Sequence, residues 1–334
     1  MPPISDRVYR IQAPYEGNAV HLYLVRGAKL ALIDSGAGDS PQAAVGPALR
    51  ELGLEWSDLD YLLNTHGHAD HAGGNGELKA AAPQVQIGIH PADGYLLAGP
   101  DAHLHSETDG SAVMRLLGRD VLLRERETVL RRIIGRSAGI DRELTEGDTV
   151  DLGQDVRLSV VHTPGHTVGS VCFFWEGEGT VFSGDAVQGH GWRAGIPPIY
   201  HDVNYSDSID RIDSLNSQVL CMGHTFGWDG VLNDPVRRGP EIAQTLQASR
   251  AASAAIDHAA VEALRQLGPE AGFAELAEAA FRELVFDLPI TFDRQTIFPM
   301  TVARAIRAHL SAHGWRAQTG SQQSAVRSRL IADS

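Results

Sequence analysis

Residues 64–74 read NTHGHADHAGG and place three histidines and one aspartate within six positions. His66 and His68 are two residues apart, so in an extended segment their imidazoles point to the same side of the chain. Asp70 and His71 follow where the glycine-rich segment turns, and their side chains can face a neighbouring point. This spacing predicts that the four side chains converge on one place.

Neutral imidazoles and carboxylates are the ligands that zinc and other first-row divalent metals prefer. A loop of solvated histidines is the alternative interpretation, but three later segments add to the metal-binding pattern. They are HTPGHTVGS with His166, FSGDA with Asp185, and CMGHT with His224. Each comes at the end of a predicted strand, where a loop can converge on the same site. The sequence therefore predicts a centre for two metal ions.

In their order and residue types, these segments resemble the metallo-β-lactamase fold superfamily of metallohydrolases, over approximately residues 7–235. The resemblance implies an α/β (α+β) fold, a four-layer αββα sandwich with the metals at one edge between two packed sheets. It also implies seven metal ligands: His66, His68 and His166 for the first ion, Asp70, His71 and His224 for the second, and Asp185 as the bridge. Asp34, in LIDSG, would steady the ligand loop. We expect two Zn²⁺ per chain, although the same ligand set accepts iron or manganese.

Two divalent ions that share one water lower its pKa toward ~7, which makes a hydroxide nucleophile available at neutral pH. Asp70 would ligate a metal and orient that hydroxide, so Asp70 and the bridging Asp185 are the candidate catalytic residues. The predicted reaction is hydrolysis of a carboxylic ester, thioester or lactone, with a small molecule as substrate. A phosphodiesterase or ribonuclease with the same dinuclear site is the alternative. A metal-containing binding or sensory protein is the third hypothesis.

The loop at residues 189–205, GHGWRAGIPPIYHDVNY, follows Asp185 and mixes aromatic, basic and proline residues. It predicts a pocket for an apolar or aromatic acyl group, in which Arg193 would contact an anion. The candidate substrate-binding residues are Trp192, Arg193, Tyr200, His201, Phe226 and Trp228. Ordinary packing beneath the loop is the alternative for each aromatic side chain.

Within the superfamily, the complete ligand set resembles the branch of glyoxalase II, lactonases and thioesterases, because many of the β-lactamases have cysteine or serine where this chain has Asp185. Glutathione thioesters are not favoured as substrates. The basic residues with which glyoxalase II binds glutathione cannot be aligned, and the chain has only two lysines, Lys29 and Lys79.

The elements that must position these residues follow from hydrophobic periodicity. Strands are predicted at 8–11, 20–25, 29–35, 58–64 and 85–90, with helices at 43–52 and 76–82. The strand at 58–64 leads directly into the histidine loop. Strands return between residues 144 and 185, and helices with alanine-rich faces follow from Pro240.

The change of pattern near residue 235 predicts three regions. They are a metallo-β-lactamase-like catalytic domain at 1–235, a helical extension at 236–320 that weakly resembles a winged helix, and a flexible tail at 321–334. The helical insertion at 106–136 is interpreted as a solvated, arginine-rich helix pair, with a lid or a dimer contact as the alternative. Exposed apolar helix surface in the extension would suit a homodimer.

The 334 residues are 43% hydrophobic and 21% charged, which is ordinary for a globular protein. The net charge of −14 disfavours nucleic acid as a partner, although residues 294–329 hold six arginines and no acidic residue. No apolar run reaches the ~20 residues that cross a bilayer, and the first residues lack a signal-peptide pattern, so we expect a cytoplasmic protein without membrane contact. Cys172 and Cys221 lie in apolar runs and are predicted core residues.

Overall fold

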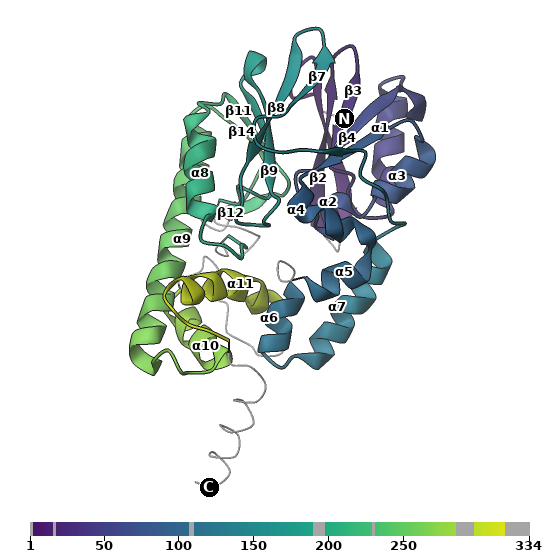
Figure 1. Ribbon diagram of the computed structural model, residues 1–334. Coiled ribbons are helices and arrows are strands. Elements are labelled where there is room, and N and C mark those ends of the chain that lie inside the picture. The colour runs from purple at the N-terminus through teal and green to yellow at the C-terminus, as the bar shows by residue number, and fades with distance from the viewer. Residues whose placement is uncertain are drawn as a thin grey trace.

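The computed structural model describes residues 3–15, 18–106, 110–189, 198–228, 231–284 and 297–317. Two six-stranded sheets lie face to face at the centre, and helices cover the outer face of each sheet (Figure 1). A second group of helices lies at one end of the sheets. The expected four-layer αββα sandwich with a helical carboxyl-terminal region is confirmed.

The first sheet comes from the amino-terminal part of the chain. In spatial order its strands are β1 (Val8–Tyr15), β2 (Asn18–Arg26), β3 (Leu30–Ile33), β4 (Leu59–Leu63), β5 (Gln86–Ile89) and β6 (Arg142–Glu143). β1 to β3 are antiparallel, and β3 to β6 are parallel. Along β2, Val20, Leu22 and Leu24 face the outer helices, whereas Tyr23 and Val25 face the second sheet. This alternation follows from the two-residue period of a strand and buries both faces of the sheet.

The second sheet has the strand order β14 (Val236–Arg238), β11 (Val219–Met222), β10 (Thr180–Gly184), β9 (Val171–Trp175), β8 (Val156–His162) and β7 (Thr149–Gly153). β10 and β11 are parallel, and the other neighbours are antiparallel. A hairpin of β12 (Phe226–Trp228) and β13 (Val231–Asn233) follows β11. Apolar side chains of both sheets, among them Ile33, Leu63, Phe173 and Phe182, form the core between the sheets.

Helices cover both outer faces of the sandwich. The first sheet carries α1 (Gly46–Glu51) and α3 (Asn75–Ala81), and the second carries α8 (Tyr205–Ser214) and α9 (Pro240–Leu267). α9 begins with a proline, whose fixed φ suits the first turn of a helix, and it ends at Gly268 with a φ of +80°. Leu246 of α9 packs in one core with Leu220 of β11, so the carboxyl-terminal helices are continuous with the sandwich.

The remaining longer helices gather at the end of the sheets where β4 and β10 finish (Figure 1). They are α5 (Pro100–His105), α6 (Gly110–Leu116), α7 (Asp120–Ile133), α10 (Phe273–Glu283) and α11 (Ile297–Ala312). Val113 and Met114 of α6 share one hydrophobic core with Val302 and Ile306 of α11. The interpretation of residues 106–136 as a solvated helix pair is therefore wrong for α6, because its apolar face is buried against the carboxyl-terminal helices.

The elements predicted from periodicity are present in the described ranges, and Cys172 and Cys221 are buried and unpaired as expected.

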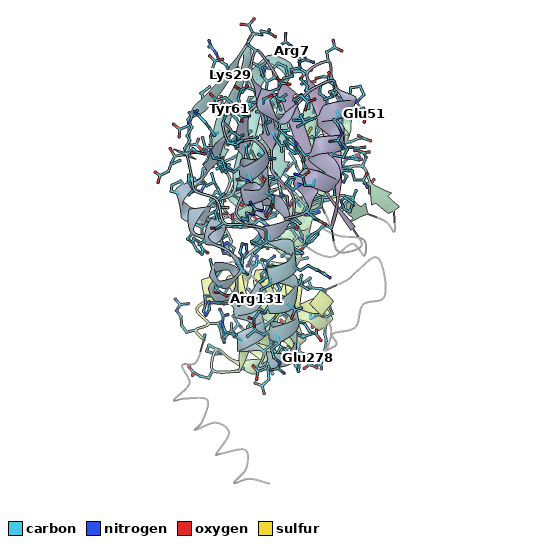
Figure 2. The ribbon with its side chains drawn as sticks, turned by 90° about the vertical axis from the view of Figure 1, so that its right-hand side faces the viewer. Arg7, Lys29, Glu51, Tyr61, Arg131 and Glu278 are labelled. Carbon is cyan, nitrogen blue, oxygen red and sulfur yellow. The ribbon has the colours of Figure 1, made fainter. Side chains whose placement is uncertain are left out.

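The two ends of the molecule differ in their secondary structure. Arg131 of α7 and Glu278 of α10 mark the helical half of the molecule in Figure 2. At the opposite end, the Nζ of Lys29 donates a hydrogen bond to the Tyr61 hydroxyl (3.1 Å). None of the described helices is both long and apolar enough to cross a lipid bilayer.

Candidate metal centre

The predicted ligands come together because the strands that carry them end at the same edge. β3 and β4 run parallel in the first sheet, and β8, β10 and β11 share one direction in the second. The loops after these strands hold Asp34, the histidine loop, His166, Asp185 and His224 in turn. Both sheets therefore deliver polar side chains to one edge of the sandwich, which faces the helical end (Figure 1).

One group consists of His66, His68 and His166, all of them buried. The Nδ1 of His68 lies 2.8 Å from the Nε2 of His166, although the two residues are 98 positions apart. The outer nitrogen of His166, Nδ1, donates to the carbonyl of Ile199 (2.6 Å), which turns Nε2 toward the group. These three side chains can offer one nitrogen each to a metal ion.

A second group consists of Asp70, His71 and His224. Asp70 and His71 lie in the short helix α2 (Ala69–Ala72), so the chain does turn directly after His68, as the spacing predicts. The Nε2 of His224 lies 3.1 Å from the Oδ2 of Asp70 and 3.3 Å from the Nε2 of His71. The outer nitrogen of His224 donates to the carbonyl of Ala19 (2.9 Å), which leaves its Nε2 facing the group.

Asp185 lies between the two groups. Its Oδ1 is 3.3 Å from the Nε2 of His71, and its Oδ2 is 3.4 Å from the Nε2 of His166. Gly223 makes this approach feasible, because a Cβ at that position would lie 2.6 Å from Asp185 Oδ1 and 2.6 Å from the ring of His71. One carboxylate can therefore face two ions.

The side chains of this cluster are better suited to binding cations than to hydrogen bonding with one another. The Nε2 of His66 is buried and has no hydrogen-bond partner among the described residues, an arrangement that costs free energy unless a ligand occupies the site. Burial and the neighbouring imidazoles hold the pKa of His66 well below its usual value, and burial lowers the pKa of His166 to about 4. Both rings are therefore neutral, which is the form that binds metals.

The carboxylates of the centre are ionised. Burial acts to raise the pKa of Asp185, but the imidazoles of His224 and His71 outweigh it and hold that pKa well below its usual range. The same competition lowers the pKa of Asp70. Conversely, burial acts to lower the pKa of His71, and the carboxylates of Asp185, Asp34 and Asp70 raise it well above its usual value. The ionised carboxylates of this cluster can therefore offer negatively charged oxygens to metal ions.

Asp34 steadies the ligand loop through three hydrogen bonds. Its carboxylate accepts from the backbone N–H and the hydroxyl of Thr65 (both 2.8 Å) and faces the Nδ1 of His71 at 2.8 Å. The Thr65 hydroxyl in turn lies 3.1 Å from the Nδ1 of His66. Asp34 has a φ of +60°, an uncommon conformation for a residue with a side chain, and such backbone strain concentrates at functional sites. The contacts of Asp34 therefore support its predicted role.

Asp93, in the short helix α4 (Pro91–Gly94), was not predicted from the sequence. Its carboxylate is fully buried and accepts from the backbone N–H groups of Gly67 and Gly169 (both 2.9 Å) and from the Thr167 hydroxyl (2.6 Å). It therefore joins the loop of His66 and His68 to the loop of His166. No local pattern distinguishes this aspartate from an exposed one, because its partners lie 26 and 76 residues away.

The predicted substrate-binding residues have different outcomes. Trp192 and Arg193 lie outside the described residues, as do the side chains of Phe226 and Trp228 on β12. Tyr200 is fully buried, and its hydroxyl contacts Ser253 of α9 (2.9 Å) and His309 of α11 (2.6 Å). Its ring thus belongs to the packing beneath the loop and offers no surface to a substrate.

His201 remains a candidate for substrate binding, because it lines a cavity next to α11. Its backbone N–H donates to the carbonyl of Gly165 (3.0 Å), the residue before His166.

This protein combines an αββα sandwich with a cluster of histidines and aspartates at the strand ends, an arrangement suited to binding metal ions. The family model of the metallo-beta-lactamase superfamily matches residues 15–224 of this chain. The chain belongs to the metallo-beta-lactamase superfamily.

Curated relatives agree with this assignment, and a solved structure shares the fold. The chain is 30% identical over 213 residues to a hydroxyacylglutathione hydrolase of Rhodospirillum rubrum. This match covers 62% of this chain and 62% of that protein. It is 24% identical over 264 residues to an atrochrysone carboxyl ACP thioesterase of Emericella nidulans, covering 78% of this chain and 68% of the relative. A metallo-beta-lactamase family protein of Thermus thermophilus shares the fold, with a TM-score of 0.64, 22% identity and coverage of 93% and 95% of the two chains.

Proposed function

We propose that this protein is a metal-dependent hydrolase that cleaves a carboxylic ester, a thioester or a lactone with a dinuclear zinc centre. The observation that carries the proposal is the convergence of five imidazoles and two carboxylates from both sheets at one edge. The names of two relatives, a hydrolase and a thioesterase, support the reaction class.

In this proposal, His66, His68 and His166 would hold one ion, Asp70, His71 and His224 would hold the other, and Asp185 would serve both. Such ions would lower the pKa of a water that acts as the nucleophile toward ~7 and would polarise a carbonyl oxygen of the substrate. The protein supplies the orientation: Asp34 fixes His71, and the Ile199 and Ala19 carbonyls fix His166 and His224.

Asp70 is the carboxylate best placed to handle a proton. Its side chain is 18% exposed, whereas that of Asp34 is 2% exposed, so Asp70 lies on the solvent side of the cluster. We propose that its carboxylate orients the attacking water, and that the proton that must later reach the leaving group comes from water or a nearby acid.

Metal removal tests the proposal. We expect exhaustive chelation to abolish hydrolysis of aryl esters, acyl thioesters and lactones, and added zinc to restore it. Elemental analysis of protein purified without added metal would identify the ion, because this ligand set also accepts iron and manganese. Undiminished turnover by the metal-free protein would contradict the proposal.

The same assay distinguishes the alternative reaction. Bis-aryl phosphates and a short RNA would be tested beside the esters at two salt concentrations. RNA binding that weakens steeply with salt, together with cleavage of phosphodiesters only, would favour the nuclease hypothesis.

A matched pair of variants tests the role of Asp70. Asp70→Asn should lower turnover severely, whereas Asp101→Asn, at an exposed carboxylate of α5, should leave turnover unchanged.

A further inference from the structure

The side-chain amide of Gln188 lies between two segments that contact predicted metal ligands. Gln188 follows Asp185 by three residues, and its Nε2 donates to the carbonyls of Asp185 (3.0 Å) and Ile199 (2.9 Å). Its Oε1 accepts from the backbone N–H of Ile199 (2.9 Å). An amide has two N–H donors and one oxygen acceptor, so these contacts use both ends of the group. Gln188 therefore joins the backbone of Asp185 to that of Ile199, which is 11 positions after Gln188.

The carbonyl of Ile199 also accepts a hydrogen bond from a predicted ligand. The Nδ1 of His166 donates to it (2.6 Å), and an oxygen with two lone pairs can accept from both side chains. The Nε2 of Gln188 lies 3.0 Å from this Nδ1, but both nitrogens carry protons here, so this distance is a packing contact. The proton of the neutral imidazole is then on Nδ1. The lone pair is on Nε2, which lies 3.4 Å from the Oδ2 of Asp185.

The orientation of the Gln188 amide follows from its partners. If its oxygen and nitrogen were exchanged, the NH₂ group would face the N–H of Ile199, and the oxygen would face the carbonyls of Asp185 and Ile199. Donors would then face donors, and acceptors would face acceptors. Only one orientation of the amide satisfies this network, and in that orientation Gln188 holds the Ile199 carbonyl beside His166.

The segment that begins at Ile199 is also fixed to the loop of His166. The N–H of His201 donates to the carbonyl of Gly165 (3.0 Å). Gly165 has a φ of +143°, and a Cβ at this position would lie 2.6 Å from the Cα of Tyr205, where α8 begins. The loop of His166 therefore packs closely against residues 199–205, and a shift of this segment would move the acceptor of His166.

We propose that Gln188 is a positioning residue of the metal centre. Through the Ile199 carbonyl it keeps the proton of His166 on Nδ1 and the lone pair on Nε2. Through the Asp185 carbonyl it ties this imidazole to the residue whose carboxylate lies between the two groups. The inference rests on the proposed function, because it takes His166 and Asp185 as ligands of one ion. Hydrogen bonds to the outer nitrogen of a metal-binding imidazole fix its orientation and its tautomer.

Gln188→Met tests this role, because methionine has a similar length but cannot donate to the two carbonyls. We expect the zinc affinity of this variant to fall about 10- to 100-fold, as for the loss of other groups that orient metal ligands. Competition with a chelator of known affinity measures the change. The matched control is Gln247→Met, at an exposed position of α9, which should keep the wild-type affinity. If Gln188→Met does not fold, Gln188→Ala replaces it, because the smaller side chain leaves room for water at the carbonyls.

The Nδ1–H proton of His166 provides a readout that a merely structural role of Gln188 would not change. In nuclear magnetic resonance spectra of the zinc-loaded protein, its signal is the ring N–H signal that is lost in His166→Gln. We expect a downfield signal that exchanges slowly with water in the wild type and in Gln247→Met, because the hydrogen bond to Ile199 is short (2.6 Å). In the Gln188 variant the signal should move upfield and exchange faster, because the carbonyl is no longer held beside Nδ1.

Two results would overturn the inference: wild-type zinc affinity in the Gln188 variant, or a lower affinity with an unchanged Nδ1–H signal. In both cases intact ester hydrolysis by the wild-type protein would leave the proposed function standing. If the wild-type protein hydrolyses no ester but the affinity and the signal both change in the variant, the hydrolase proposal fails and the positioning role of Gln188 stands.

Discussion

At the scale of single residues, side chains outside the His and Asp cluster hold the predicted ligands in place by hydrogen bonds. Asp34 contacts Thr65 and His71. Asp93 contacts the loop that holds His66 and His68 and the loop that holds His166. Such partners fix the orientation of an imidazole and therefore the position of its free nitrogen.

Asp34→Asn should weaken metal binding about 10- to 100-fold, because the amide loses the negative charge and cannot accept from three donors as the carboxylate does. The measurement is competition for zinc with a chelator of known affinity. Asp39→Asn, at an exposed carboxylate nearby, is the control and should keep the wild-type affinity. Equal affinity of both variants would count against the role of Asp34.

Asp93→Asn should lower the free energy of unfolding by about 1–3 kcal/mol, because the amide turns one acceptor into a donor that faces a backbone N–H or a hydroxyl. Urea unfolding of the zinc-loaded protein measures this change. Asp101→Asn, at an exposed carboxylate, should change stability by far less. A stability of Asp93→Asn equal to that of the control would show that the two loops do not depend on this carboxylate.

The sequence predicts which His and Asp residues come together better than it predicts the residues that support them. His66, His68, Asp70 and His71 are close in the chain, so spacing alone indicates a cluster. Asp93 has no such pattern, because its position depends on how distant elements pack. Tyr200 is a second example. The composition of its loop does not show whether an aromatic side chain lines a substrate pocket or is buried in the core, as that of Tyr200 is.

At the scale of elements, helices α9 and α11 hold the segment next to the metal centre. The Tyr200 hydroxyl contacts Ser253 and His309, and His309 Nδ1 contacts the carboxylate of Asp257 (2.8 Å). Tyr200 is one residue from Ile199, whose carbonyl orients His166. A polar chain through two helices therefore supports one predicted ligand.

Tyr200→Phe should lower the free energy of unfolding by about 1–3 kcal/mol and leave KM unchanged, because it strips partners from buried Ser253 and His309 without changing the substrate surface. Chemical unfolding and steady-state kinetics measure the two quantities. Tyr9→Phe is the control, since the Tyr9 hydroxyl donates to the Asp6 carbonyl (3.0 Å) in an exposed hydrogen bond. A raised KM with unchanged stability would instead place Tyr200 in the pocket.

At the scale of the whole molecule, the helical extension shares a hydrophobic core with the second sheet. The predicted boundary near residue 235 therefore does not separate two cores. β14 adds a strand to the sheet, and α9 begins two residues later and packs on the outer face of that sheet.

A chain truncated after Arg238 should be insoluble or unfolded, because removal of α9 to α11 exposes Val181, Leu220 and their apolar neighbours. Solubility, circular dichroism and gel filtration would check this. A chain ending at residue 317 keeps every described contact and is the matched control. A soluble, cooperatively unfolding fragment of residues 1–238 would contradict the prediction and show that the sandwich is independent of its helices.

The wide separation of the cluster members along the chain bears on biosynthesis. His68 meets His166 across 98 positions, and His71 meets His224 across 153. Contacts of such long range form late, since large loops must close first. On a translating ribosome, a nascent polypeptide that ends before His224 cannot yet possess both groups of predicted ligands. We therefore expect cation capture to be a maturation step that follows synthesis of the sandwich, rather than a template that guides it.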